Sequence, residues 1–212
     1  MPIPPIKRYF TYLALGLGVA SLPAAVATPG FDMQLIQKFK TPQPLTKNEV
    51  AFIKQTYGKE MDPSLIRKRL GGCQAPQGAI MEAGLGDDDT IYICHPRFLS
   101  ADYTLDKDPE RFRAFFHETT HRWQAQTAYA YTKGRCREYF YPLLSSENRF
   151  GDYCDEQQGA IMEDYALRFL FPGGAPSHWY SKKNGGDNKK SDARLKKLVE
   201  DRFPGIRGVH LK

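Results

Sequence analysis

The sequence has no Cys-x-x-Cys pair, and it holds only four cysteines, two tryptophans and five histidines in 212 residues. Without that cysteine spacing, a zinc site built from four thiolates is disfavoured. Basic and aromatic residues also do not interleave as they do in nucleic-acid readers, so the net charge of +6 predicts no nucleic-acid partner. These absences direct attention to the histidines and carboxylates.

The first 27 residues have the pattern of a secretory signal peptide. Lys7 and Arg8 precede an apolar, uncharged stretch, and Ala25-Val26-Ala27 forms a small-x-small cleavage site. We therefore expect a secreted or periplasmic protein, cleaved near Ala27, with no stable membrane insertion afterwards. An uncleaved membrane anchor stays open, because an apolar run of about 17 residues is near the lower limit for spanning a bilayer.

All four cysteines, Cys73, Cys94, Cys136 and Cys154, follow the predicted cleavage site. An even count in an oxidising compartment suggests two structural disulfides, for which three connectivities exist. We favour Cys73 with Cys94 and Cys136 with Cys154, because each pair closes a short local loop.

The chain is organised around residues 108–129, which contain His117, Glu118 and His121 in the pattern H-E-x-x-H. On an α-helix, residues four apart lie on one face, so both imidazoles can bind one cation. The Glu118 carboxylate then lies beside the metal and can accept a proton from water. The pattern predicts a catalytic Zn2+ site, the alternative being a surface helix with solvated side chains.

Local signals favour a helix here. Asp108 is a good N-cap and Pro109 suits the first helical position. Aromatic side chains supply the apolar surface that would bury the helix: Phe112, Phe115, Phe116 and Trp123.

A third metal ligand is expected from a second helix over residues 155–171. Glu156 and Glu163 are seven residues apart, about 10 Å along a helix axis, so one ion can bind only one of them. Gly159 would allow close approach of the two helices, which favours Glu156. Glu163 or Asp164 would then orient a ligating imidazole, although a solvated Glu163 stays open.

These motifs resemble those of known peptidases. The HETTH motif followed by an E-x-x-[GA] helix resembles the gluzincin metallopeptidases. More narrowly, FFHETTHRWQAQ with DYCDEQQGAIMEDY is similar to poorly characterised bacterial metallopeptidases with HE-x-x-H-x-W-Q and E-Q-Q-[AG] signatures, some encoded with Rhs or Vgr proteins. The resemblance implies that His117, His121 and Glu156 bind Zn2+ and that Glu118 is the base.

Two departures limit the resemblance. Gln124 and Thr127 occupy positions where a metzincin has Gly and His, which excludes that family. Ala160 stands where the thermolysin-like pattern has Asp, which leaves the support of the ligands undetermined.

We expect an α+β fold in which a small antiparallel sheet packs beside the H-E-x-x-H helix and the glutamate-bearing helix. Its strands are predicted at residues 64–70, 78–83 and 90–94. After the signal peptide we expect a loose entry segment at residues 28–44 and a zincin-like catalytic domain at residues 45–171. A basic linker with a short helix follows at residues 172–212.

The predicted function is hydrolysis of peptide bonds in a protein or peptide substrate. Candidate donors to the oxyanion are Tyr139, Tyr141, Tyr165 and His178, which the sequence does not rank. Two alternatives stay open: a catalytically inactive zinc-binding adaptor, and a secreted effector or toxin with one target. The oligomeric state is not determined by the sequence.

Overall fold

Four short strands form a mixed sheet in the order β1-β2-β4-β3. They are β1 (Gln43–Pro44), β2 (Arg67–Leu70), β3 (Met81–Ala83) and β4 (Thr90–Ile93). The computed structural model describes residues 32–74, 81–83, 88–127, 136, 141, 149–172, 189–209 and 211. The predicted signal peptide lies outside these residues. The predicted α+β class is confirmed.

One pairing in the sheet differs from the expected antiparallel arrangement. Strand β4 pairs antiparallel with β3, with Glu82 opposite Tyr92, but parallel with β2, with Lys68 opposite Ile91. The reason is the strand order: β3 lies at the edge, so its hairpin partner β4 fills the middle and runs in the direction of β2. The edge strand β3 is thereby the strand that faces the H-E-x-x-H helix.

The sequence suggested a loose segment at residues 28–44, but the described part of it, residues 32–44, is ordered into a helix and a strand. They contain helix α1 (Met33–Phe39), whose N-cap Asp32 accepts hydrogen bonds from the backbone amides of Gln34 and Leu35 at 2.9 and 3.1 Å. Phe39 at the end of α1 is buried, and the Lys68 ammonium lies 5.4 Å from its ring centroid. This tertiary contact holds a helix too short to be stable alone.

Helix α2 (Lys47–Tyr57) begins with the predicted capping box between Thr46 and Glu49 and ends at Gly58, where φ is +63°. The Glu49 carboxylate also accepts a hydrogen bond from the buried ammonium of Lys68 at 2.7 Å. This ion pair is fully buried and joins α2 to the sheet. The short 3₁₀ helix η1 (Gly58–Glu60) follows.

Helix α3 (Pro109–Thr127) carries the H-E-x-x-H motif. The four aromatic side chains expected to bury it, Phe112, Phe115, Phe116 and Trp123, have no exposed surface. Phe112 and Phe116 meet the ring of Phe52 in α2 edge-to-face, and Phe115 stacks on Tyr103. Trp123 stacks on Tyr57 and meets Phe203 edge-to-face. The motif therefore lies on a helix that is fixed on its apolar face.

Helix α4 (Asp155–Tyr165) continues into a π-helical turn, η5 (Ala166–Leu170), and helix α6 (Lys189–Arg202) follows. Further 3₁₀ helices are η2 (Pro96–Phe98), η4 (Phe150–Asp152) and η6 (Pro204–Gly208). Part of the C-terminal segment belongs to the core, because Leu195, Val199 and Ile206 are fully buried there. The predicted boundary at residue 171 is thus not a boundary of the core.

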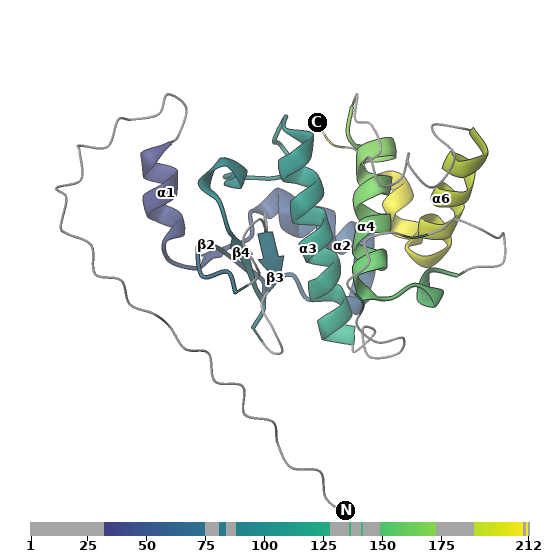
Figure 1. The fold of residues 1–212 in the computed structure, drawn as a ribbon, viewed down its shortest axis with the longest axis horizontal. Helices are drawn as coiled ribbons and strands as arrows, with labels where there is room; N and C mark the ends of the chain where they lie inside the picture. The colour runs from purple at the N-terminus through teal and green to yellow at the C-terminus, as the bar shows by residue number, and fades with distance from the viewer. Residues whose placement is uncertain are drawn as a thin grey trace, which may run out of the picture. The chain divides into compact units, whose positions relative to one another are not determined.

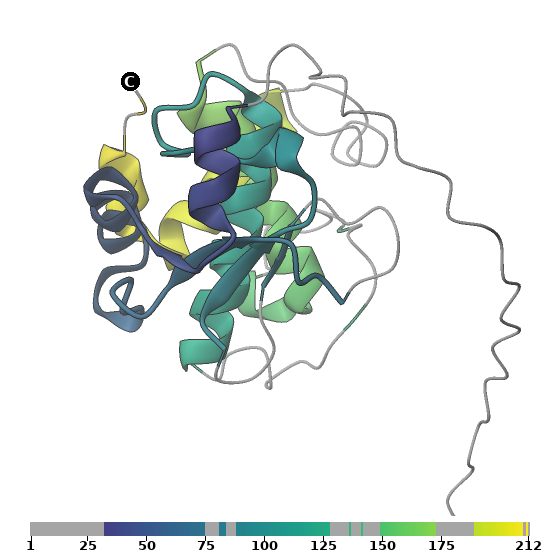
Figure 2. The same ribbon diagram turned by 90° about the vertical axis from the view of Figure 1, so that its left-hand side faces the viewer.

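Helices α3, α4 and α6 lie side by side next to the sheet (Figure 1). Helix α3 packs between strand β3 and helix α4, and α4 packs in turn against α6. Helix α1 lies across β2 on the other side, as the turned view shows (Figure 2). None of the described helices is both long and apolar enough to cross a membrane.

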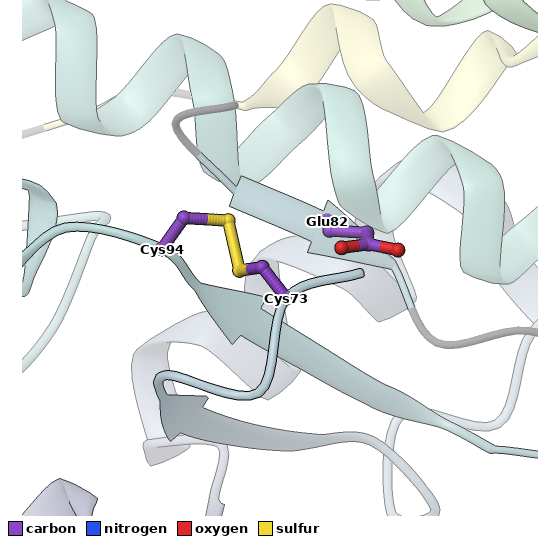
Figure 3. Close-up of side chains that lie close together, drawn as sticks. All are labelled: Cys73, Glu82 and Cys94. Carbon is purple, nitrogen blue, oxygen red and sulfur yellow. A yellow bond between two sulfur atoms is a disulfide. The ribbon is translucent and has the colours of Figure 1, made fainter. Parts of the chain in front are cut away.

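Both favoured disulfides are formed. Cys73, just after β2, is bonded to Cys94, just after β4, and the Glu82 carboxylate of β3 lies nearby (Figure 3). Cys136 is bonded to Cys154, the N-cap residue of α4. The first bond ties the parallel strands together at one end, and the second holds the start of the helix that carries Glu156.

Candidate metal centre

The two motif histidines lie on one face of α3, one turn apart, as their spacing predicts. Their Nε2 atoms are 3.1 Å from each other. His117 is 6 % exposed, and His121 is half-buried. The aromatic packing on the opposite face of α3 orients both imidazoles toward α4.

Helix α4 brings Glu156 to these two nitrogens. Its Oε2 atom lies 3.3 Å from His117 Nε2 and 3.5 Å from His121 Nε2. With the 3.1 Å distance between the imidazole nitrogens, the three atoms form a nearly equilateral triangle. Two helices separated by 27 residues of chain thus contribute to one cluster.

This triangle has the size that a zinc ion requires. Ligand atoms bound to zinc at about 2.0–2.1 Å in tetrahedral directions are about 3.3 Å apart. The three observed distances of 3.1, 3.3 and 3.5 Å surround that value. Two imidazoles and one carboxylate are also a donor set that zinc prefers, with a fourth direction left for water. The residues therefore fit a catalytic zinc ion.

Gly159 allows α4 to approach α3 this closely. A Cβ atom added at Gly159 would stand 2.7 Å from Cε1 and 2.8 Å from Nε2 of His117. Real Cβ atoms do not make such contacts, so only glycine fits under the imidazole at this position. Gly159 was expected to permit close approach, and its specific neighbour is the ring of a predicted metal ligand.

Glu163 and Arg113 support His117 from behind. The Oε2 atom of Glu163 lies 3.2 Å from His117 Nδ1, and its Oε1 atom pairs with the Arg113 guanidinium. The exposed carboxylate of Glu110 also binds Arg113, at 2.6 Å. Glu163 therefore lies where a carboxylate orients an imidazole through the nitrogen that faces away from the metal. Sequence reasoning missed Arg113, although it stands four residues before His117 on the same helical face.

A neutral amide, Gln124, supports His121. Its Oε1 atom lies 2.7 Å from His121 Nδ1, and its Nε2 atom donates to the backbone carbonyl of Asp155 at 3.0 Å. The same Nε2 atom donates to Gln158 Oε1 at 2.9 Å. In the sequence, Gln124 and Gln158 entered only as members of the HE-x-x-H-x-W-Q and E-Q-Q-[AG] signatures, with Gln124 also excluding metzincins, and neither was assigned a role in the site. Their positions could have indicated a role in the site, because Gln124 follows His121 by one helical turn and Gln158 follows Glu156 by two residues.

The carboxylates around His117 determine its charge. Burial lowers the pKa of His117, but hydrogen bonds to Glu156 and Glu163 outweigh burial and raise it to about 10. Burial raises the pKa of Glu156, but its hydrogen bond with His117 and the positive charge of that imidazole outweigh burial and bring the pKa well below its ordinary value. The pKa of Glu163 is lowered in the same way, by His117 and Arg113 against burial. A cation in this cluster would take the place of the His117 proton, because histidine binds metals in its neutral form.

Glu118 extends from α3 toward the edge strand. Its Oε2 atom accepts a hydrogen bond from the backbone amide of Ala83 in β3 at 2.7 Å. Among the described residues, no hydrogen bond reaches its other oxygen, Oε1. The carboxylate is half-buried and adjoins His117 in the sequence. Ala83 thus fixes one oxygen of the predicted base and leaves the other for a proton.

The candidate oxyanion donors are not brought to the cluster, as far as the described residues go. The Tyr141 hydroxyl donates to Asp164, the other residue considered for orienting a histidine. The Tyr165 hydroxyl donates to Glu200 of α6 at 3.1 Å. Tyr165 is nine residues beyond Glu156, which places it about 13 Å further along α4. Tyr139 and His178 lie outside the described residues.

Two further groups of metal-binding residue types contain cysteines. Cys73 and Cys94 lie near Glu82, and Cys136 and Cys154 lie near Asp155. Both cysteine pairs are disulfide-bonded, so they offer no thiolates. Of the groups found among the described residues, His117, His121 and Glu156 are the one whose ligand atoms are available.

Known proteins offer a limited comparison. No protein-family model matches the chain, and no curated protein matches it. Among solved structures, the effector domain of Pseudomonas aeruginosa VgrG2b is similar to this chain at 21 % sequence identity. The alignment covers 86 % of this chain and 88 % of that domain, with a TM-score of 0.47.

Proposed function

We propose that this protein is an exported zinc-dependent hydrolase that cleaves peptide bonds. The observation that carries the proposal is the triangle formed by His117 Nε2, His121 Nε2 and Glu156 Oε2, with edges of 3.1, 3.3 and 3.5 Å. The adjacent carboxylate of Glu118 supplies the base that such a centre needs. The two disulfides support export, because disulfides persist in oxidising compartments.

His117, His121 and Glu156 would hold the ion. When bound there, zinc supplies Lewis acidity, which lowers the pKa of a water from about 15.7 to about 7 and polarises a carbonyl. Residues of the protein itself would bind the substrate, orient the ligands and transfer protons.

Glu118 moves the proton in this proposal. The Ala83 amide holds Oε2, so Oε1 is the atom that accepts a proton from the attacking water. Water then adds to the carbonyl carbon of the substrate, and the carbon–nitrogen bond of the peptide breaks. Glu118 returns its proton to the departing amine, which restores the carboxylate.

Strand β3 offers a means of holding an extended peptide. It is the edge strand of the sheet and packs against α3, so one side of its backbone lies next to the metal centre. Edge strands bind extended peptides through main-chain hydrogen bonds. This arrangement favours a peptide over a substrate without a repeating amide backbone.

The test compares the mature wild-type protein with Glu118→Gln. Elemental analysis should find zinc in both, because Glu118 is not a ligand. Cleavage of a peptide library should be seen in the wild type, should be removed by a chelator and restored by zinc, and should be lost in the variant by at least about 100-fold. Retained cleavage in Glu118→Gln would remove this residue from the role of base.

The alternatives predict other outcomes of the same experiment. A zinc-binding adaptor without catalysis would contain the metal but cleave neither the library nor a protein mixture. An effector with one target would leave the library intact and cleave a single protein in a mixture, in a chelator-sensitive way. A protein without zinc would contradict the proposed function altogether.

A further inference from the structure

We propose that Gln124 and Gln158 are positioning residues whose paired side-chain amides hold His121 in the tautomer that carries its proton on Nδ1. In that tautomer Nε2 presents a lone pair to the cation. The inference deepens the proposed function: the catalytic role of this tautomer rests on that function, whereas the tautomer itself does not. The hydrogen-bond pattern that carries it involves only described residues.

Gln158 is the fixed end of the pair. It is 2 % exposed, and its Nε2 atom donates to the backbone carbonyls of Tyr153 at 2.7 Å and Phe150 at 3.3 Å. A carbonyl accepts hydrogen bonds and never donates them, so the nitrogen of this amide must face those two oxygens. The Oε1 atom of Gln158 is therefore the end that faces Gln124.

Gln124 takes its orientation from two acceptors. It is 1 % exposed, and its Nε2 atom donates to Gln158 Oε1 at 2.9 Å and to the backbone carbonyl of Asp155 at 3.0 Å. Both hydrogens of the amide are then used. Reversing the amide would direct its oxygen at two other oxygens with no hydrogen between them, which is costly at a buried site. Gln124 must direct Oε1 at His121.

An acceptor at 2.7 Å requires a hydrogen on His121 Nδ1. A neutral imidazole with its proton on Nδ1 has its lone pair on Nε2, the atom that lies 3.1 Å from His117 Nε2 and 3.5 Å from Glu156 Oε2. The orientation imposed by backbone carbonyls near α4 is thus passed through two amides to a histidine on α3.

The two histidines are supported by different chemistry. His117 has a carboxylate, Glu163, at its Nδ1 atom, whereas His121 has an uncharged amide. The amide adds no charge to the cluster, and it also bonds the carbonyl of Asp155, the residue directly before Glu156. One side chain therefore fixes the direction of His121 and the position of the helix turn that carries the third ligand.

The first experiment reads the tautomer directly. Long-range proton–nitrogen NMR spectra of metal-free protein labelled with ¹⁵N-histidine distinguish a protonated ring nitrogen from one with a lone pair. The His121 signals are identified by their loss in His121→Gln. We expect a protonated Nδ1 and an unprotonated Nε2 in the wild type. A proton on Nε2, with or without one on Nδ1, would overturn the inference, whatever the protein catalyses.

The second experiment uses matched variants and measures zinc affinity by competition with a chelating indicator. Gln124→Met keeps the length of the side chain and removes both hydrogen-bonding ends. We expect zinc affinity to fall about 10- to 100-fold and the preference for the Nδ1-protonated tautomer to be lost. Gln158→Met removes one of the two acceptors of Gln124, so the same changes should be smaller.

Gln126→Met is the control. Gln126 lies on the same helix and bonds the backbone of Asp62 at 2.7 and 3.2 Å, away from the histidines. The Gln126→Met variant should leave the His121 tautomer and the zinc affinity unchanged.

Unchanged affinity and tautomer in a folded Gln124→Met would contradict the proposal, as would an equal loss in Gln126→Met. If Gln124→Met does not fold, the wild-type spectrum decides. A wild type with the expected tautomer but no zinc binding would refute the proposed function and leave the role of the amides in orienting His121 intact.

Discussion

Gly159 lies directly under the imidazole of His117, so close that a Cβ atom at this position would stand 2.7 Å from the ring carbon Cε1. The contact joins α3 and α4, the two helices that carry the predicted metal ligands, at the point where they meet. A glycine inside a helix costs about 1 kcal/mol relative to alanine. The chain bears this cost at the one place where a side chain would push the ring of a predicted ligand.

Gly159→Ala should therefore show whether this glycine matters for the zinc site, since alanine favours a helix more than glycine does. The added methyl must displace His117, so we expect zinc affinity to fall at least about tenfold, together with a stability loss of about 1–3 kcal/mol from overpacking. Competition titration and thermal unfolding of the metal-free protein measure the two effects. The control Ala160→Gly, which removes a methyl from the next residue, should lower stability while zinc affinity stays close to that of the wild type. Tighter or unchanged zinc binding in Gly159→Ala would show that the ring tolerates the methyl.

Glu156 and Glu163 should differ in kind when each is changed to Gln. Glu156→Gln removes a charged ligand, so zinc should be lost from the purified protein, as elemental analysis would reveal. Glu163→Gln removes the negative charge that faces His117 Nδ1 and Arg113, and it should retain zinc with about 10- to 100-fold weaker affinity. Glu110→Gln changes the exposed partner of Arg113 and should have little effect on zinc. If Glu163→Gln lost zinc while Glu156→Gln kept it, the two roles would be reversed.

Removing either disulfide should lower stability by a similar amount, but the two removals should differ in their effect on zinc binding. Their sequence separations are 21 and 18, so replacing either pair by serine should cost about 3 kcal/mol of unfolding free energy. Only the change at Cys136 and Cys154 should also weaken zinc binding, because Cys154 caps α4 directly before Asp155 and Glu156. Denaturant unfolding of the metal-free protein and zinc titration give the two quantities. Equal weakening of zinc binding by both double variants would argue that the second disulfide acts only through overall stability.

Two buried tyrosines should make the fold sensitive to alkali. Burial raises the pKa of Tyr57 and of Tyr103 above the ordinary value of 10.0. A pKa higher in the folded than in the unfolded chain gives stability that is complete below about pH 10 and is lost as pH rises through the folded value. We expect these tyrosines to ionise only as the chain unfolds, so tyrosinate absorbance and loss of circular dichroism should change together.

Tyr57→Phe provides the matched variant for this alkaline transition. It removes the ionising hydroxyl, whose partner is Thr120 at 3.0 Å, and keeps the ring that stacks with Trp123. The midpoint of alkaline unfolding should move to higher pH, while neutral stability falls by about 1 kcal/mol through the lost hydrogen bond. An early rise of tyrosinate absorbance by the amount of two buried residues, with circular dichroism unchanged, would contradict the prediction.

Much of the site was determined by local sequence. The spacing of His117 and His121 fixes them on one helical face, because α-helical periodicity depends only on backbone geometry. The aromatic residues of α3 are buried as their pattern predicted. The capping box at Thr46 and the end of α2 at Gly58 were also predictable, since they depend on residues within one turn. The short loops between cysteines likewise favoured the disulfide pairs that are formed.

Tertiary structure alone decided how distant parts meet. Sequence favoured Glu156 over Glu163 through a small neighbouring residue, but only the packing of α4 on α3 gives each carboxylate its own nitrogen of His117. The packing of α4 against α6 lets the Tyr165 hydroxyl donate to Glu200, a partner that the sequence did not indicate. The parallel pairing of β2 with β4 follows from the strand order. The amides of Gln124 and Gln158 meet across the two helices, and no periodicity along one segment encodes a contact between side chains 34 residues apart.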